Sequence, residues 1–154
     1  MNIKEQKLHK TFMEVAKNIS QLSNCVSHKV GAVLVKDNRI VSTGYNGTPP
    51  GFINCCDKFP NYSIDNREEH HNFSKKFEIH AELNTILCAA KNGISTNDCI
   101  LYCTLQPCNE CLKIICNSGI KTVYFDKFYD KAIFDQDVAQ MLIISNVKVL
   151  KLNI

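Results

Sequence analysis

The sequence has no run of lysine and arginine longer than two residues, and its formal net charge is only +3. Proteins that bind duplex nucleic acid carry a basic patch or stripe, because contacts to phosphate dominate that binding. The missing basic run therefore argues against a nucleic-acid partner. A small positive charge is compatible with a single anionic small molecule.

Long hydrophobic segments are also missing. No stretch approaches the roughly 18 apolar residues of a membrane-spanning helix. The start of the chain, MNIKEQKLHKTFMEVAKNIS, interleaves charges with apolar residues and does not resemble a signal peptide. We therefore expect no membrane association and a cytoplasmic location, in the host cytoplasm if the chain is viral. The 154 residues, 45% of them apolar, predict one domain over residues 1–154.

Cysteine, in contrast, is abundant, with nine residues in the chain. Disulfides are disfavoured in the cytoplasm, so we expect the cysteines to be metal ligands or small buried side chains. Four of them fall on apolar faces of expected helices or strands and are predicted to lie in the core. These are Cys88, Cys99, Cys103 and Cys116.

Hydrophobic periodicity predicts alternating helices and strands along the chain. The expected helices cover residues 4–21, 80–91, 108–118 and 134–145, and the expected strands cover 30–35, 39–45, 99–104, 121–125 and 147–152. The first two strands meet at KDN, a hairpin signal. Residues 52–78 follow the segment GYNGTPPG, show no clear period and are expected to form a long functional loop.

This order of elements predicts an α/β protein with a three-layer α/β/α architecture. Its five-stranded mixed sheet should contain one antiparallel hairpin, followed by strands joined through helical crossovers. In such sheets the chemistry gathers where strands lead into helices. The starts of the helices near residues 80 and 108 are therefore the places to search.

Three metal-binding side chains stand at those two helix starts. His80 opens the segment HAELN, and Cys108 and Cys111 are three residues apart in PCNEC, which places both thiols on one side of a helical turn. Imidazole nitrogen and thiolate sulfur suit zinc, and three protein ligands leave the fourth position for water. The positive ends of the helix dipoles favour the thiolates. We therefore predict a catalytic zinc at His80, Cys108 and Cys111.

Glu82 is better placed to face the water than to bind the ion. We expect it to take a proton from the water and return it to a ring nitrogen and a leaving amine. A Cys-x-x-Cys pair alone is often a structural zinc site or a redox pair, and a lone histidine is usually a surface residue. Together with Pro107, however, the residues follow the H-x-E…P-C-x-x-C pattern of zinc deaminases.

Longer segments extend this likeness. HAELN, AAKNG, VGAVLVKDNRIVSTGYNGTPPG and PCNEC followed by IIxxxGIKxVxF resemble the deoxycytidylate (dCMP) deaminases of bacteriophages and eukaryotes, from about residue 24 to residue 130. Asn84 and GYNGTPPG distinguish this group from tRNA adenosine deaminases and from free-nucleoside cytidine deaminases. The resemblance implies a cytidine deaminase-like fold and hydrolytic conversion of dCMP to dUMP and ammonia, which supplies thymidylate synthesis.

The resemblance also implies residues that contact the substrate. Asn46 corresponds to an asparagine that contacts the sugar, although Asn-Gly is also a favoured turn. The N–H group of Ala81 corresponds to one that holds the base carbonyl. Relatives often have two arginines where this chain has Ser27 and His28. We expect Ser27 and Lys29 to contact the 5′-phosphate, with His28 adding charge when protonated, unless Lys29 is an ordinary solvated lysine.

Two further properties follow from the resemblance. Family members are typically homohexamers, activated by dCTP and inhibited by dTTP, each bound with Mg²⁺ at subunit interfaces. Gly47 and Lys91 are the expected effector contacts in this chain. Phage members often hold a second zinc, and the matching ligands here are Cys25, Cys55, His70 and Glu78, with Cys56 and His71 as possible substitutes. That zinc would fix residues 52–78 beside the active site.

Three alternatives remain open from the sequence. They are a deaminase that accepts dCTP as well as dCMP, a deaminase that acts on cytosine or adenine in tRNA or single-stranded DNA, and a zinc-stabilised module without catalysis. Weak basicity, and the lack of a Lys/Arg-rich groove with stacking aromatics, argue against nucleic acid. Glu82 argues against a purely structural module, because a structural zinc site has no use for it.

Overall fold

The computed structural model describes residues 2–132 and 134–153. The helices are α1 (Ile3–Ser20), α2 (Cys55–Lys58), α3 (Arg67–Phe77), α4 (Ala81–Lys91), α5 (Asn109–Cys116) and α6 (Gln136–Ile144), with a 3-10 turn, η1 (Ile64–Asn66). The strands are β1 (Gly31–Lys36), β2 (Arg39–Tyr45), β3 (Ile100–Leu105), β4 (Thr122–Lys127) and β5 (Lys148–Lys151). Every helix and strand that the sequence predicts is present, with ends within two residues of those expected.

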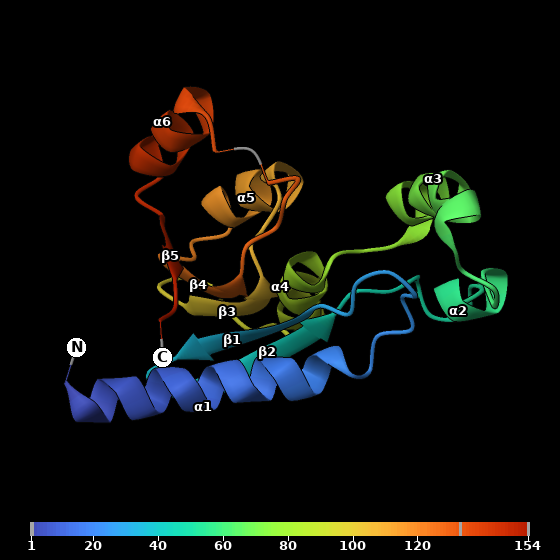
Figure 1. Ribbon diagram of the computed structural model, residues 1–154. Helices are drawn as coiled ribbons and strands as arrows, with labels where there is room; N and C mark the ends of the chain where they lie inside the picture. The colour runs from blue at the N-terminus through green and yellow to red at the C-terminus, as the bar shows by residue number, and fades with distance from the viewer. Residues whose placement is uncertain (1, 133, 154) are drawn as a thin grey trace.

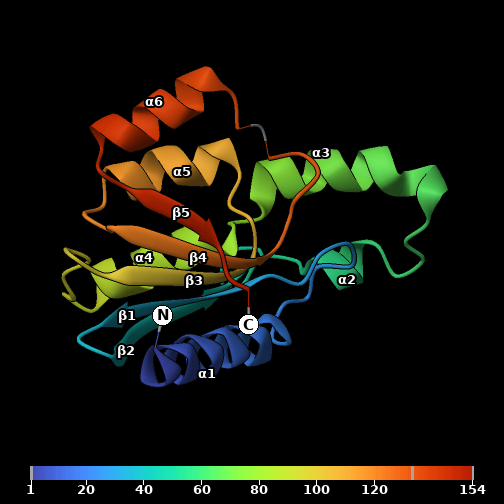
Figure 2. The ribbon, with the colours of Figure 1, turned by 60° about the vertical axis from the view of Figure 1, so that its left-hand side comes forward.

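The five strands form one mixed sheet in the order β2-β1-β3-β4-β5. Helix α1 covers one face, and α4, α5 and α6 cover the other (Figures 1 and 2). The three-layer α/β/α prediction is therefore confirmed. The sheet contains the expected hairpin of β1 with β2, and also a second antiparallel pair, β1 with β3, that the sequence did not predict. The reason is that the crossover through α4 makes β3 parallel to β2, and β1 lies between them.

The hairpin at KDN has the geometry that its residues favour. Lys36 pairs with Arg39, so Asp37 and Asn38 form a two-residue turn with φ angles of 50° and 57°. Both angles are positive, as a type I′ turn requires, and asparagine and aspartate tolerate that conformation. This turn sets the pairing of Val35 with Ile40, and the register then shifts by one residue of β2, so that Leu34 pairs with Ser42.

Strand β1 illustrates how the core is divided. Ala32 and Leu34 pack in the layer under α4, α5 and α6, whereas Val33 and Val35 pack against α1. Successive side chains of a strand point to opposite faces, so an uninterrupted apolar strand is suited to the centre of a sheet covered on both sides. Within the described residues, no helix is both long and apolar enough to cross a membrane.

The prediction of an irregular loop over residues 52–78 is wrong. The region contains α2, η1 and the eleven-residue helix α3 (Figure 1). The signal is weak because α3 buries only His70 and Phe73, with Phe77 partly buried, and its other residues are polar. The buried side chains join Phe59 in a small cluster beyond the end of the main core. This aromatic contact gives the region more apolar support than the sequence suggested.

Candidate active site

Helix α4 is held unusually close to β2. Ser42 Oγ donates a hydrogen bond of 2.8 Å to the carbonyl of Thr85. A Cβ atom added to Gly44 would lie 2.5 Å from the nitrogen of Thr85 and 2.8 Å from the carbonyl oxygen of Ala81. Small residues on β2 therefore let the first turn of α4 lie directly on the sheet, which fixes the side chains that begin this helix.

Three metal-binding side chains meet where α4 and α5 begin. His80 and Cys108 are the N-cap residues of these two helices, and Cys111 lies in the first turn of α5. His80 Nδ1 is 3.3 Å from Cys111 Sγ and 3.4 Å from Cys108 Sγ. The sequence had placed both residues inside their helices, but their backbones are extended. We call these residues the three-donor cluster.

The three-donor cluster has dimensions that suit a zinc ion. Tetrahedral zinc, with bonds of about 2.0–2.3 Å, separates its ligands by about 3.3–3.8 Å. Among the described residues, no fourth histidine, cysteine or carboxylate donor belongs to this cluster. A structural zinc site usually has four protein ligands, whereas a catalytic site has three and one exchangeable position. The donor set therefore fits a catalytic zinc.

The side chains of this cluster polarise one another. The pKa of Cys108 falls to about 4, chiefly because the Cys111 thiol donates a hydrogen bond to its sulfur. The same interaction, followed by burial, raises the pKa of Cys111. A hydrogen bond to Cys108 raises the pKa of His80 to about 9 against the effect of desolvation. The cluster thus stabilises one thiolate, and a bound metal would require the other sulfur to lose its proton.

Glu82 lies in the first turn of α4 beside this cluster and is only 4% exposed. Burial raises the pKa of the Glu82 carboxyl, and hydrogen bonds together with the charge of His80 oppose the shift. A carboxyl group whose pKa is raised toward the working pH can both accept and return a proton. Glu82 is therefore suited to general acid–base chemistry.

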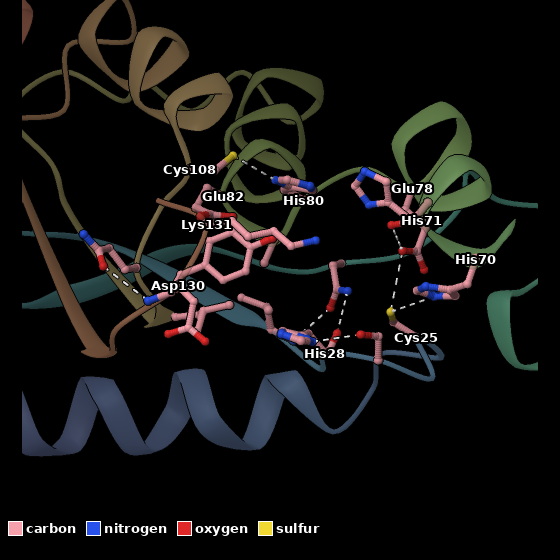
Figure 3. A pocket seen from close by; sticks show the side chains of 18 of the residues that line it. Cys25, His28, His70, His71, Glu78, His80, Glu82, Cys108, Asp130 and Lys131 are labelled. Atoms are coloured by element: carbon pink, nitrogen blue, oxygen red, sulfur yellow. Dashed lines mark hydrogen bonds between the residues drawn. The ribbon is translucent and has the colours of Figure 1, made fainter. Parts of the chain in front are cut away.

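A cavity of about 300 Å³ opens in front of His80, Glu82 and Cys108. Figure 3 shows these side chains on one side of the cavity and Cys25, His70 and Glu78 on the other. Pockets that hold small ligands have volumes from about 300 Å³ upwards. The cavity can therefore hold a small molecule next to the three-donor cluster.

The residues on the far side of the cavity form a second group of donors, which we call the four-donor cluster: Cys25, Cys55, His70 and Glu78. His70 Nε2 is 3.2 Å from Cys55 Sγ and 3.9 Å from Cys25 Sγ, and Cys25 Sγ is 3.6 Å from Glu78 Oε2. Glu78 Oε1 is buried and has no hydrogen-bond partner among the described residues. An orphaned carboxylate oxygen among sulfur and nitrogen donors fits a four-coordinate metal.

Burial sets the protonation of the four-donor cluster. It raises the pKa of Cys25, raises the pKa of Cys55 to about 12 and lowers the pKa of His70. The thiols and the imidazole are thus neutral on their own, and a cation would displace the thiol protons. The substitutes considered for this cluster lie outside it, because Cys56 hydrogen-bonds Asp57 and His71 lines the cavity.

One short segment joins the two clusters. Glu78 and His80 flank Ile79, which exchanges two backbone hydrogen bonds with Gly47, at 2.8 and 3.1 Å. The turn GYNG therefore anchors the residue between a ligand of each cluster. This contact gives GYNGTPPG a structural role that the sequence did not reveal.

Comparison with known proteins identifies the family. Residues 6–127 match the model described as the cytidine and deoxycytidylate deaminase zinc-binding region. This chain belongs to the cytidine and deoxycytidylate deaminase family. The deoxycytidylate deaminase of Enterobacteria phage T4 is 41% identical to this deaminase-family chain over 151 residues, covering 79% of this chain and 78% of the phage protein.

Two further relatives agree with the assignment to the deaminase family. The deoxycytidylate deaminase of Schizosaccharomyces pombe is 37% identical over 135 residues, covering 85% of this chain and 39% of the yeast protein. The dCMP deaminase from cyanophage S-TIM5 is 34% identical in sequence to this chain, and its crystal structure in complex with dCMP and dUMP superposes on this one with a TM-score of 0.74. It matches 99% of each chain.

Not all of the substrate contacts expected from the deaminase family lie at the cavity. Asn46, Ala81 and Ser27 line the cavity, but Lys29 does not. The flanking His28 and Val30 do line it. Asn46 also accepts from the N–H of Val30 and donates to the carbonyl of His28, so its amide holds this segment in place.

The expected effector residues lie apart within one chain. Gly47 borders a second cavity of about 380 Å³ beside GYNGTPPG, whereas Lys91 is the exposed last residue of α4. Because Gly47 pairs with Ile79 just before α4 begins, the two are separated by the length of the helix, about 15 Å. Gly47 and Lys91 of one chain therefore cannot both contact a small group.

The cysteines predicted to be core residues also need one correction. Cys99 and Cys103 are buried and Cys116 is partly buried, but Cys88 is exposed. Cys88 follows the exposed Leu87 on the outer side of α4, so the apolar side of this helix is wider than its buried side.

Two cationic cavity residues, Arg67 and Lys131, were not identified from the sequence, and His71 was considered only as a substitute zinc ligand. The i, i+4 spacing of Arg67 and His71 could have revealed that they share a face if α3 had been recognised. No sequence signal identified Lys131.

Proposed function

We propose that this protein removes the amino group of dCMP by hydrolysis and releases dUMP and ammonia. The observation that carries the proposal is a buried Glu82 beside three metal donors at the wall of a cavity large enough for a nucleotide base. The names of the relatives, and the dCMP and dUMP in the cyanophage structure, support the choice of substrate.

In this mechanism His80, Cys108 and Cys111 would hold a zinc ion, which supplies a Lewis acid that makes water nucleophilic near neutral pH. Glu82 accepts the proton that water loses as it attacks C4 of the pyrimidine, and delivers a proton to N3. Glu82 then accepts the proton of the new hydroxyl group on C4 and transfers it to the amino group. The C4–N bond breaks, ammonia leaves and the C4 carbonyl of dUMP forms. The N–H group of Ala81, in the first turn of α4, lacks an acceptor within its helix and can donate to the base carbonyl.

We further propose that the four-donor cluster holds a second zinc with a structural role. Four ligands complete a tetrahedral site and leave no position for water. The donors come from the segment before β1, from α2, from α3 and from the residue after α3. A metal there would tie these segments together beside the cavity.

Regulation and assembly rest on the family resemblance alone. We propose a homo-oligomer, by the resemblance a hexamer, with dCTP as activator and dTTP as inhibitor, each bound with Mg²⁺. The resemblance places this effector at a subunit interface, and the separation of Gly47 and Lys91 within one chain is compatible with that position. Action in the cytoplasm and use of dCTP as a second substrate stay predictions from the sequence.

The decisive experiment is turnover of dCMP by the purified, zinc-loaded chain and its Glu82→Gln variant. The variant should retain the zinc of the three-donor cluster and lose about 10²- to 10⁴-fold in kcat, the range that general acid–base catalysis contributes. Glu14→Gln, an exposed carboxylate on α1 across the sheet, is the matched control and should leave kcat unchanged.

A nucleotide panel should include deoxycytidine, dCTP, tRNA and single-stranded DNA. Activity on tRNA or DNA with none on dCMP would contradict the proposal. Turnover that survives Glu82→Gln would contradict the assigned proton shuttle.

A further inference from the structure

We propose that one face of α3, together with Lys131 across the cavity, forms the anion subsite that selects a 5′-monophosphate nucleotide. The cationic side chains are Arg67 and Lys131, and His71 and His28 add imidazole groups to the lining of the same cavity. The inference rests on the proposed function, because it names the part of the substrate that this wall of the active-site cavity recognises.

The first observation is the face that α3 turns to the cavity. Its lining residues Arg67, His70, His71 and Ser74 occur at helical positions i, i+3, i+4 and i+7. The same face therefore serves two purposes. His70 belongs to the four-donor cluster, whereas Arg67 and His71 belong to no metal cluster and present donors to the cavity.

The second observation is that these cations have no protein partner. Among the described residues, neither Arg67 nor Lys131 takes part in an ion pair, and the side chains of Arg67, His71 and Lys131 make no hydrogen bond. Figure 3 shows Lys131 extending into the cavity from the side opposite His71. Arginine and lysine donors that line one cavity suit a phosphate group.

The acidic groups that line the same cavity leave this positive charge largely uncompensated. Glu82 is buried beside the three-donor cluster, and Glu78 accepts hydrogen bonds from Cys25 and Ser74. Asp130 is the remaining carboxylate among the described lining residues. The cavity wall thus carries two cationic side chains and one exposed carboxylate, and the imidazole groups of His28 and His71 add further hydrogen-bonding nitrogens.

The third observation concerns the segment before β1, where the arginines expected from relatives are absent. Ser27 and His28 line the cavity but are engaged with each other, with Ser27 Oγ 3.0 Å from His28 Nδ1, and Lys29 is not among the lining residues. The chain has only two arginines, and Arg67 is the one that lines the cavity. The guanidinium that can bind phosphate through two donors therefore comes from α3.

The test compares ligands that differ only in the phosphate. Calorimetric titration of the zinc-loaded chain with dUMP and with deoxyuridine measures affinity without turnover. Arg67→Gln and Lys131→Gln should each weaken dUMP binding by about tenfold or more, as expected for charged hydrogen bonds. Deoxyuridine binding should change by less than about twofold. In kinetics, kcat/KM should fall for dCMP and not for deoxycytidine.

Matched controls are Arg39→Gln at the start of β2 and Lys121→Gln before β4. Both are exposed, and neither residue lines the cavity. Inorganic phosphate should inhibit the wild type competitively and the Arg67→Gln variant less strongly.

Equal losses for dUMP and deoxyuridine, or no loss for dUMP in either cavity variant, would overturn the subsite. A chain that binds dUMP as expected but fails to turn over dCMP would instead refute only the proposed reaction.

Discussion

At the scale of single residues, Glu82 and Tyr102 show that burial acts on both chemistry and stability. Burial raises the pKa of both side chains, and Tyr102 belongs to the core layer under α1. Glu82 borders the cavity, so its raised pKa can serve proton transfer. The Tyr102 hydroxyl instead meets His9 of α1, with 2.8 Å between the oxygen and Nδ1.

That contact makes His9 a pH-dependent part of the fold. Burial lowers the pKa of His9 below its usual value and outweighs the attraction of Glu5. The unfolded chain therefore binds a proton at a higher pH than the folded chain does. Stability contributed by neutral His9 is complete above about pH 6.5 and is lost as the pH falls below that value.

Between about pH 7.5 and about pH 5.5, the melting temperature of a His9→Gln variant should therefore fall by less than that of the wild type. Circular dichroism at both pH values measures the difference, and the other titrating groups are common to both proteins. Parallel losses in the two proteins would show that His9 does not titrate differently on folding.

At the scale of elements, the contact of α4 with β2 controls the position of His80 and Glu82. Gly44→Ala should destabilise the protein by about 1–3 kcal/mol, the usual cost of overpacking. It should also reduce dCMP turnover, because α4 must move away from the sheet. Gly47→Ala is the matched control, since an added Cβ there meets no atom within 4 Å. Equal unfolding free energies for both variants in denaturant titrations would contradict this account.

The four-donor cluster has a similar test at the level of elements. Metal analysis should give two zinc ions per chain for the wild type and one for Cys25→Ala. Because the cluster ties α2 and α3 to the segment before β1, hydrogen exchange should become faster in residues 52–78 of the variant. Cys88→Ala, at an exposed cysteine, should retain both ions. One zinc per wild-type chain would contradict the second site.

The extent to which the sequence predicted the structure differed between elements. The helices α1, α4 and α5 were predicted because apolar side chains recur along them, and the three-donor cluster followed from motifs at two helix starts. Helix α3 was missed because His70, Phe73 and Phe77 are too few to produce a clear period. The cavity wall that includes Arg67 and Lys131 was missed with it, since residues from α3 and from the segment after β4 meet only in the folded chain.

At the scale of the whole molecule, the proposed oligomer follows the family and has a direct measurement. Ile143 and Ile144 on α6 are 78% and 76% exposed, so apolar surface is available on the outer layer. Light scattering coupled to gel filtration should give a mass six times the chain mass of 17.4 kDa. A single-chain mass at micromolar concentration would remove the interface on which the proposed effector site depends.

The positions of the metal donors along the chain also matter before folding is complete. All four donors of the second cluster lie between residues 25 and 78, whereas the first cluster requires residues 80, 108 and 111. Ribosomes deliver a polypeptide from its N-terminus, so the earlier donors leave the exit tunnel while Cys108 and Cys111 are still unmade or enclosed. If the proposed structural ion binds this second cluster, the nascent chain can capture it first, before the thiols proposed to serve the chemistry are exposed to competing metals in the cell.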